Sequence, residues 1–487
     1  MEKRNKTSSS MLSALGMQLV SKYSNVAVQL AVTMVLARLL TPEEFGTVAI
    51  VTVFTSFFSI LADVGVSTAI VQYKDLTRDD YDALFLFCLL LGLGLAGVFC
   101  LLSLPISMVY GDVQLVPLCC LASLSTLFSA ANMVPNGILL RERRFRAISV
   151  RLVVASVFSG SLAIGLAAAG FGCYALVWQS VASAGIVLAW NWTATRVRLT
   201  NRHFIAPLSK IFRFSIYQAG FSTINYFARN LDNLLVGGVM GSAQLGYYDK
   251  AYRIMGYPIN YLTGIFSSVL QPYLSDYQDD KPRLYQSWLG ICRVLALVGM
   301  FITAVFVCFP AEIVLVMFGD QWEAAIPAVA TLGVSVGMQM VNSTSGAIFQ
   351  SAGRTDELLK SGLICTSLSL VAILVGVATG SIALLGLCVS LAYAAHLCVT
   401  SRLLVRKVLG QGALSFLRSL LPSTLACIAA IGAAYTAGFL AAGLGDAISI
   451  AVRVAACMGA YAIVELATGE WRCISVFRDM KRMGASE

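Results

Sequence analysis

The chain has 487 residues, of which 58% are hydrophobic and only 12% are charged, and its mean hydropathy is +0.79. A soluble domain carries about 25% charged residues, so this composition excludes a soluble globular protein and indicates a polytopic membrane protein. A net charge of +9 can indicate nucleic-acid binding, but the distribution of the basic residues argues against it.

Apolar runs long enough to cross a bilayer recur along the whole chain and predict an all-α bundle of about fourteen transmembrane helices. A β-barrel would show shorter, alternating segments. The first run continues through Leu36 and Ala37 without a cleavage site, which favours a full-length helix over a signal peptide. The predicted spans are 11–37, 45–71, 83–105, 114–139, 148–169, 172–195, 214–236, 245–273, 285–309, 324–350, 358–379, 382–401, 419–440 and 447–468.

Lysine and arginine alternate between successive connecting segments. Every second segment carries them, starting with the N-terminal one, and the segments between carry none apart from Arg38. The largest clusters lie within 141–151 and 196–213. By the positive-inside rule, this pattern predicts that both termini are cytoplasmic. The basic excess is then explained by topology and by attraction to anionic membrane lipids, and we expect no nucleic-acid partner.

The order of motifs suggests an internal repeat. Gly111 and Asp112 open the fourth span, and Gly319 and Asp320 precede the tenth. At an offset of 200, Gly46 also falls on Gly246, although sequence identity between the halves is near chance. We therefore expect two six-helix lobes related by an axis along the membrane normal, with a cavity between them that suits alternating access. The expected divisions are an N-terminal lobe at 1–200, a C-terminal lobe at 201–410, and two additional helices with a cytoplasmic tail at 411–487.

Several ionisable side chains fall inside the predicted spans, where a charge is costly and normally faces protein or water. Arg229 lies roughly 15 Å from the outer end of its span, at 1.5 Å per residue. Cations outnumber acids in these spans, and a cationic surplus facing a cavity predicts an anion site. The cations are Lys22, Arg229, Lys250, Arg253 and Arg293, and the acids are Asp63, Asp232 and Asp249.

These residues also have structural interpretations. Arg229 and Asp232 are three residues apart and can form an internal ion pair. The uncharged polar residues Asn25 and Asn225 can form interhelical hydrogen bonds. Individual long cations can extend to the membrane interface, an alternative that applies to Lys22, Lys250 and Arg293.

The sequence favours no metal or organic cofactor. It has only two histidines, its 13 cysteines form no CxxC pair, and it has no GxxxxGK[ST] motif for ATP. Asp63 is an acid near the middle of the second span, without a basic residue close to it in sequence. It can cap a helix or bond between lobes, or it can carry H⁺ or Na⁺ during transport.

Two blocks of sequence resemble a known family. Residues 37–46 read ARLLTPEEFG, and residues 58–72 read FSILADVGVSTAIVQ. Residues 229–237 read RNLDNLLVG and are followed by LGYY and AY. These segments resemble bacterial polysaccharide exporters, the oligosaccharide flippases of the MOP superfamily, in the branch of colanic-acid and teichuronic-acid exporters. The resemblance is weak over the last 80 residues or so.

The resemblance implies a two-lobed carrier in the bacterial inner membrane. Such a carrier moves an undecaprenyl-diphosphate-linked oligosaccharide to the outer leaflet through a cationic cavity. In such a carrier we expect Arg229, Arg253 and Arg293 to contact the diphosphate. The resemblance also implies other polysaccharide-assembly proteins as partners. It implies no enzymatic step.

Two other functions remain open from the sequence. A cation-coupled drug exporter of the MATE type usually needs a central acid, and Asp63 is suitable, but the cationic surplus disfavours it. A membrane glycan polymerase or ligase usually needs a large outer loop, and the predicted outer loops are short. A non-transporting scaffold would lack a cationic cavity.

Overall fold

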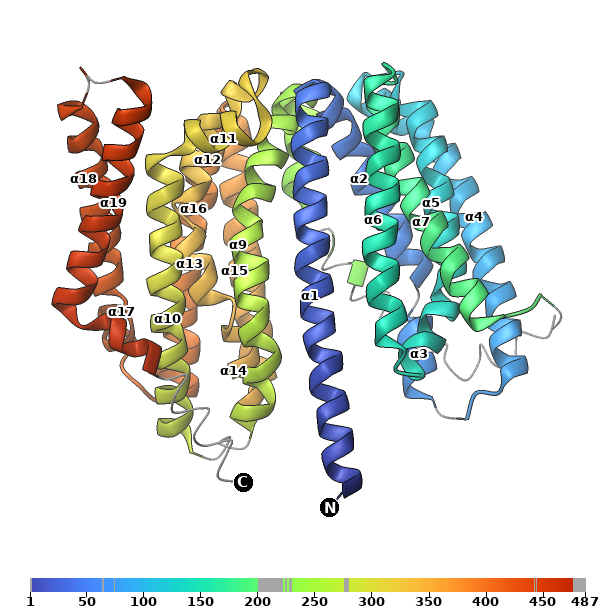
Figure 1. The fold of residues 1–487 in the computed structure, drawn as a ribbon, viewed down its shortest axis with the longest axis horizontal. Coiled ribbons are helices and arrows are strands. Elements are labelled where there is room, and N and C mark those ends of the chain that lie inside the picture. The colour runs from blue at the N-terminus through green and yellow to red at the C-terminus, as the bar shows by residue number, and fades with distance from the viewer. Residues whose placement is uncertain are drawn as a thin grey trace. The chain divides into compact units, whose positions relative to one another are not determined.

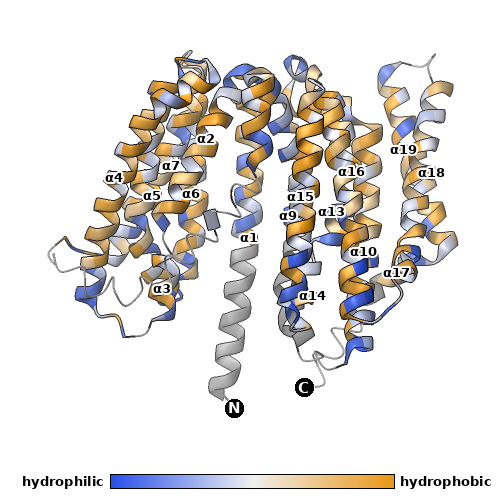
Figure 2. Ribbon diagram, turned by 180° about the vertical axis from the view of Figure 1, so that it is seen from behind, coloured by the Kyte–Doolittle hydropathy of each residue, from blue (hydrophilic) through white to orange (hydrophobic). Residues whose placement is uncertain are grey.

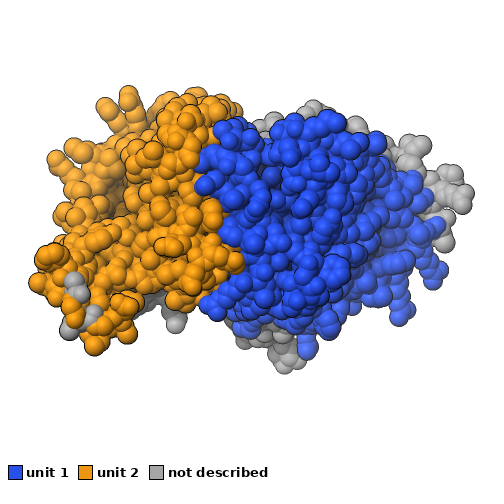
Figure 3. Space-filling view, turned by 90° about the horizontal axis from the view of Figure 1, so that it is seen from above, with its two compact units in different colours: residues 1–246 blue, residues 247–487 orange. Residues whose placement is uncertain are grey.

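The computed structural model describes residues 2–63, 65–73, 75–199, 222, 223, 226, 230–275, 280–441, 443 and 445–475. Within these ranges the chain contains helices and turns but no strands. It divides into two compact units, residues 1–246 and 247–487 (Figures 1 and 3). The predicted lobe limits at residues 200 and 410 remain predictions.

The first unit is built from long helices joined by short turns (Figure 1). Residues 230–240 are also helical, and the unit ends in the first turn of the next helix, at Gly246. The helices are α1 (Glu2–Leu39), α2 (Pro42–Asp63), α3 (Val66–Gln72), α4 (Arg78–Tyr110), α5 (Leu115–Arg141), α6 (Phe145–Ala168), α7 (Cys173–Thr195) and the beginning of α9 (Ser242–Ser275).

Local sequence signals explain where several of these helices begin and end. Ahead of α2, the Thr41 amide donates to the Glu44 carboxylate at 2.7 Å, and the Glu44 amide donates to the Thr41 hydroxyl at 3.3 Å. This reciprocal capping box accounts for the TPEE motif, because it satisfies amides that have no partner in the helix. A second box, of Thr77 and Asp80, begins α4, and Gly111 ends α4 at a φ of 68°.

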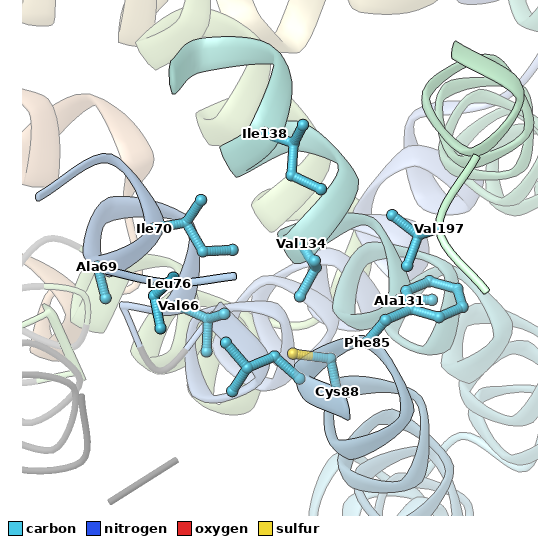
Figure 4. Packing of buried hydrophobic residues seen from close by; sticks show 11 residues of the cluster. Val66, Ala69, Ile70, Leu76, Phe85, Cys88, Ala131, Val134, Ile138 and Val197 are labelled. Atoms are coloured by element: carbon cyan, nitrogen blue, oxygen red, sulfur yellow. The ribbon is translucent and has the colours of Figure 1, made fainter. Parts of the chain in front are cut away.

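Helix α5 is the centre of the first unit, since it packs against α2, α3, α4 and α7. Helix α6 packs between α1 and α7. A buried apolar cluster joins α3, α4 and α5 (Figure 4). In it, Ile70 of α3 and Cys88 of α4 are fully buried, as is Val134 of α5. This cluster holds the short helix α3 against the long helices.

Two glycines allow the N-terminal turns of α2 and α9 to meet at backbone distance. A Cβ atom on Gly46 would lie 1.7 Å from the Ser242 carbonyl oxygen. A Cβ atom on Gly246 would lie 2.0 Å from the Pro42 carbonyl oxygen. These are the two glycines that coincide at the sequence offset of 200. Neither position has room for a side chain.

The second unit contains long helices together with several short ones. It holds most of α9. Its other elements are α10 (Lys281–Cys308), α11 (Pro310–Phe318), η1 (Asp320–Ala325), α12 (Ile326–Gly333), α13 (Val336–Asn342), α14 (Ser345–Ser351), α15 (Thr355–Ala378), α16 (Ile382–Thr400), η2 (Ser401–Val408), α17 (Ala413–Ser419), α18 (Leu421–Leu440), α19 (Asp446–Thr468) and η3 (Glu470–Ser475).

The last long helices, α18 and α19, pack against each other, and α18 packs along α10. Arg453 of α19 strengthens this attachment. Its Nη1 lies 2.6 Å from the Glu312 carboxylate of α11, and its guanidinium lies 5.0 Å from the centre of the Phe309 ring. Arg453 is thus part of the docking of the C-terminal helix pair.

Ten helices in the described ranges are long and apolar enough to cross a membrane, or eleven if the bent stretch from η1 to α14 is one span. Figure 2 shows hydrophobic residues along most of them. The protein is therefore a multi-pass membrane protein, while the total of fourteen spans and the symmetry of the lobes remain predictions. Predicted span 324–350 is not one straight helix, because it bends by 45° around residues 334–335.

Arginines of the basic segments bond to carbonyl groups at helix ends. Arg141 donates to the carbonyls of Ile70 and Tyr73, at 3.3 and 3.1 Å. Arg78 donates to the carbonyls of Thr195 and Arg196, at 3.2 and 3.3 Å. The last carbonyls of a helix lack partners within it and carry partial negative charge. The basic residues that indicate topology therefore also stabilise these helix ends.

Candidate functional site

The first half of α9 holds the clearest charged cluster among the predicted site residues. Asp249 and Lys250 are buried, with 8% and 5% of their surfaces exposed. The Arg253 Nε donates to the Asp249 carboxylate at 2.7 Å, one helical turn away. About half of the Arg253 side chain, 53%, remains exposed. Asp249 therefore holds the guanidinium in place without burying it.

The outer edge of the Arg253 guanidinium remains available. The ion pair with Asp249 uses only Nε, and neither terminal nitrogen bonds to a side chain or carbonyl in the described ranges. Two terminal N–H groups of a fixed guanidinium match the spacing of phosphate oxygens. The exposed guanidinium of Arg253 is therefore the part of the cluster that suits an anion.

Two tyrosines continue the same face of α9. Tyr257 and Tyr261 follow Arg253 at intervals of four residues, and their rings stack with centres 6.2 Å apart and planes 10° from parallel. We call Asp249, Arg253, Tyr257 and Tyr261 the α9 column. Our sequence reasoning missed the tyrosines, although the four-residue spacing placed them on the face of Arg253. An aromatic face beside a fixed cation suits a sugar joined to a phosphate.

Arg293 of α10 lies in a different environment. Its Nε is 3.9 Å from the Glu470 carboxylate of η3 and forms no hydrogen bond within the described ranges. About 40% of its side chain is exposed. Glu470 lies just beyond α19, so Arg293 interacts with the C-terminal segment. The structure gives no contact between Arg293 and the α9 column.

Arg229 and Asn225 lie outside the described residues, so the predicted pair of Arg229 with Asp232 stays a prediction. Asp232 lies in the helical stretch 230–240 and is buried, with 7% of its surface exposed. Its Oδ1 accepts a hydrogen bond from the backbone amide of Asn233 at 2.9 Å.

Lys22 and Asn25 lie on one face of α1. Asn25 accepts a hydrogen bond from the Ser156 hydroxyl of α6. This contact is the interhelical bond that its structural interpretation predicted. Lys22 is exposed, three residues earlier on the same helix.

Asp63 occupies a break in the second predicted span. It is the last residue of α2, and Gly65, with a φ of 69°, precedes α3. Its Oδ1 is buried and accepts no hydrogen bond from any described residue. A carboxylate is disfavoured at a helix C-terminus, where the helix dipole is negative. The continuous apolar pattern of the sequence did not reveal this break, and a role of Asp63 in carrying H⁺ or Na⁺ stays a prediction.

Two observations concern metal-ligating and thiol groups in the described part of the chain. No group of three or more His, Cys, Asp or Glu residues there is arranged to hold a metal ion. Cys473 lies in η3, outside the spans, and burial raises the pKa of its thiol to about 11. That thiol is therefore protonated at neutral pH and is a poor nucleophile.

The chain is similar to several bacterial proteins of polysaccharide biosynthesis. WzxC of Escherichia coli strain K12, a lipopolysaccharide biosynthesis protein, is 26% identical over 365 residues, which cover 70% of each chain. ExoT of Rhizobium meliloti strain 1021, a succinoglycan biosynthesis transport protein, is 25% identical over 382 residues, which cover 77% of this chain and 76% of ExoT.

Solved structures show the same fold at low sequence identity. The lipid II flippase MurJ, in an inward closed conformation, aligns with a TM-score of 0.69 at 11% identity, covering 92% of this chain and 98% of MurJ. An inward-facing MATE multidrug transporter of the MOP superfamily aligns with a TM-score of 0.58 at 18% identity, covering 83% of this chain and 95% of the transporter.

A family profile described as "Polysaccharide biosynthesis protein" matches residues 35–327. This region includes the capping motif before α2, the break at Asp63 and the α9 column. The profile matches more than half of the chain, and the chain therefore belongs to the polysaccharide biosynthesis protein family.

Proposed function

We propose that this protein is a flippase for a lipid-linked oligosaccharide. It moves a glycan unit carried on undecaprenyl diphosphate from the cytoplasmic to the outer leaflet of the bacterial inner membrane. The unit is then used for polysaccharide, O-antigen or exopolysaccharide synthesis. The protein is a transporter and not an enzyme, in keeping with its family and relatives. The family and the transport role of the relative ExoT support this function.

The observation that carries the proposal is the exposed guanidinium of Arg253. Asp249 orients it through Nε, which leaves the terminal nitrogens for the diphosphate. Buried Lys250 adds positive charge beside it, and Arg229 and Lys22 add further cations along the path. Arg293 contacts the same substrate when its ion pair with Glu470 is broken. The isoprenoid tail stays in lipid while the charged and sugar parts cross.

The proposal includes the predicted organisation of the chain. Two lobes, at 1–200 and 201–410, alternate access to a central cavity, and residues 411–487 add two helices and a tail. Both termini lie in the cytoplasm, and the protein works beside other polysaccharide-assembly proteins. The Oδ1 of Asp63, which accepts no hydrogen bond from a described residue, supports coupling to H⁺ or Na⁺, with Asp232, Asn25 and Asn225 in supporting roles.

A MATE-like drug exporter is the second candidate. Asp63 favours it, because a buried acid with one oxygen that bonds to no described residue suits cation coupling. The α9 column disfavours it, because organic drugs of this class are mostly cationic and Arg253 would repel them. A glycan polymerase has no observation in its favour.

Deletion of the gene tests the function directly. We expect the undecaprenyl-diphosphate-linked oligosaccharide to accumulate on the cytoplasmic leaflet, and plasmid-borne wild type to clear it. Drug susceptibility is measured in the same strains. Unchanged lipid-linked glycan together with increased drug sensitivity would reject the flippase in favour of the drug exporter.

A further inference from the structure

The first unit contains a polar cavity away from the α9 column. Helices α1, α6 and α7 line it, and α6 packs against both of the others (Figure 1). Its volume is about 220 Å³, room for several water molecules of about 30 Å³ each. The lining residues are Gln29, Val32, Ser156, Ser159, Leu176, Gln179, Ser180 and Ser183.

The lining is rich in hydrogen-bonding groups but carries no charge. It contains two primary amides and four hydroxyls, and the only apolar residues in it are Val32 and Leu176. Ser180 bonds to the Val177 carbonyl at 2.7 Å, and Ser156 bonds to Asn25. Gln29, Gln179 and Ser183 make no hydrogen bond to any described residue. Their donors and acceptors are therefore free for a ligand or for water.

These unused groups identify the chemistry of a ligand. A phosphate would need a cation, and a drug cation would need a carboxylate or an aromatic wall, but the lining has none of these. Each amide offers both donors and acceptors, and each hydroxyl does both. A neutral ring that bears several hydroxyls can bond to all of these donors and acceptors. Such polar groups are costly in a membrane segment, so their gathering around one cavity calls for a polar occupant.

The position of the cavity relates it to the proposed substrate. Lys22, Asn25 and Gln29 follow one another at intervals of three and four residues, on one face of α1. Lys22 is about 10 Å along the helix from Gln29, at 1.5 Å per residue. At this separation, Lys22 and the cavity can contact different parts of one diphosphate-linked oligosaccharide.

We propose that this cavity is a carbohydrate subsite that binds an uncharged sugar ring of the transported lipid-linked oligosaccharide. The inference rests on the proposed flippase function. In this assignment Gln29, Gln179 and Ser183 bond to sugar hydroxyls. The subsite therefore recognises the sugar part of the substrate, while the cationic residues bind the diphosphate.

Lipid binding by the purified full-length protein tests the subsite. The probes are undecaprenyl diphosphate, the oligosaccharide-bearing lipid isolated from the deletion strain, and phosphatidylglycerol, whose headgroup also bears hydroxyls. The test variant combines Gln29→Leu, Gln179→Leu and Ser183→Ala, which nearly preserve volume but remove hydrogen bonds. Matched controls are Gln114→Leu in an exposed turn and Ser161→Ala on the exposed side of α6.

We expect wild type and both controls to bind the glycosylated lipid more tightly than undecaprenyl diphosphate. The triple variant should lose about tenfold or more of this preference, the effect of losing two or three hydrogen bonds. Its affinity for undecaprenyl diphosphate should stay unchanged, which also shows that it is folded. Ser183→Thr, which keeps the hydroxyl, should retain most of the preference.

Three results would overturn the assignment, and each leads to a different conclusion. A triple variant that keeps the full preference for the glycosylated lipid rejects the subsite alone. A variant that loses only phosphatidylglycerol binding shows a phospholipid headgroup site instead. A wild-type protein that binds neither undecaprenyl lipid rejects the proposed function and the subsite together.

Discussion

At the scale of single residues, Arg253 is the side chain most directly tied to transport. Arg253→Ala should lower glycan export at least about tenfold, because it removes a charge-assisted contact with the diphosphate. Arg253→Lys should keep partial export, since an ammonium attracts phosphate but lacks the two-pronged geometry. Export is measured as surface glycan per amount of membrane-inserted protein. Arg406→Ala, at an exposed position in η2, is the control, and normal export by Arg253→Ala would exclude diphosphate contact there.

Substitutions of Arg229 and Asp232 distinguish a structural ion pair from a cation that binds the substrate. If Arg229 contacts the diphosphate, Arg229→Ala should abolish export even when combined with Asp232→Ala. If the two residues only neutralise each other, removing both charges should restore what either single substitution loses. The same export assay decides, and a double alanine variant with normal export leaves only the structural pair.

Asp63 is expected to matter for transport but not for folding. Its buried Oδ1 has no hydrogen-bond partner in the described ranges, so Asp63→Asn removes an ionisable group without breaking a bond at that atom. Export should fall, while the thermal midpoint of the purified protein stays the same or rises. Export at the wild-type level, with a normal amount of protein in the membrane, would remove Asp63 from the coupling mechanism.

At the scale of secondary-structure elements, the contact between α2 and α9 depends on two glycines. Gly46→Ala should destabilise the protein by about 2 kcal/mol or more, because its Cβ would collide with the Ser242 carbonyl and backbone atoms cannot move aside easily. The measurement is the thermal midpoint in detergent.

Gly94→Ala and Gly97→Ala are matched controls for the glycine contact. Both positions lie in α4, and a Cβ atom at either would meet no atom within 4 Å. We expect no loss, or a small gain from the better helix propensity of alanine. A Gly46→Ala protein as stable as these controls would contradict the close contact.

The helix ends also show how local signals and distant contacts combine. The apolar run predicted 83–105 for the third span, whereas α4 covers Arg78–Tyr110. The polar first turn, capped by Thr77 and Asp80, is helical although it is not apolar. Predicted span 172–195 agrees closely with α7, because Gly172 and Arg196 interrupt the helical conformation at its two ends.

At the scale of the whole molecule, topology is the main untested prediction. Reporter fusions at Arg144 and Arg202 should report the cytoplasm, and fusions at Ser242 and Asp320 the outside. The physical reason is that basic segments resist translocation and remain on the cytoplasmic side. Alkaline phosphatase and green fluorescent protein fusions provide opposite signals at each site. One reversed site would contradict the two-lobe arrangement.

The membrane class, the helical architecture and most helix positions follow from the amino-acid sequence alone. Hydropathy, caps and turn glycines act over a few residues, so they can be read along the chain. The family resemblance at the α2 capping motif was likewise a local signal, and the family match confirms it. Even the pairing of Arg253 with Asp249 was within reach, because the two residues are one helical turn apart.

Which distant residues meet depends on how the helices pack, and the sequence did not predict it. Arg293 pairs with Glu470, and Arg453 with Glu312, across long stretches of chain that no local rule connects. The break at Asp63 stayed hidden because both sides of it are apolar. The cavity of α1, α6 and α7 likewise arises from polar residues that each look like isolated interhelical contacts in sequence. Packing brings their unused hydrogen-bonding groups together, and a one-dimensional pattern does not record which helix faces meet.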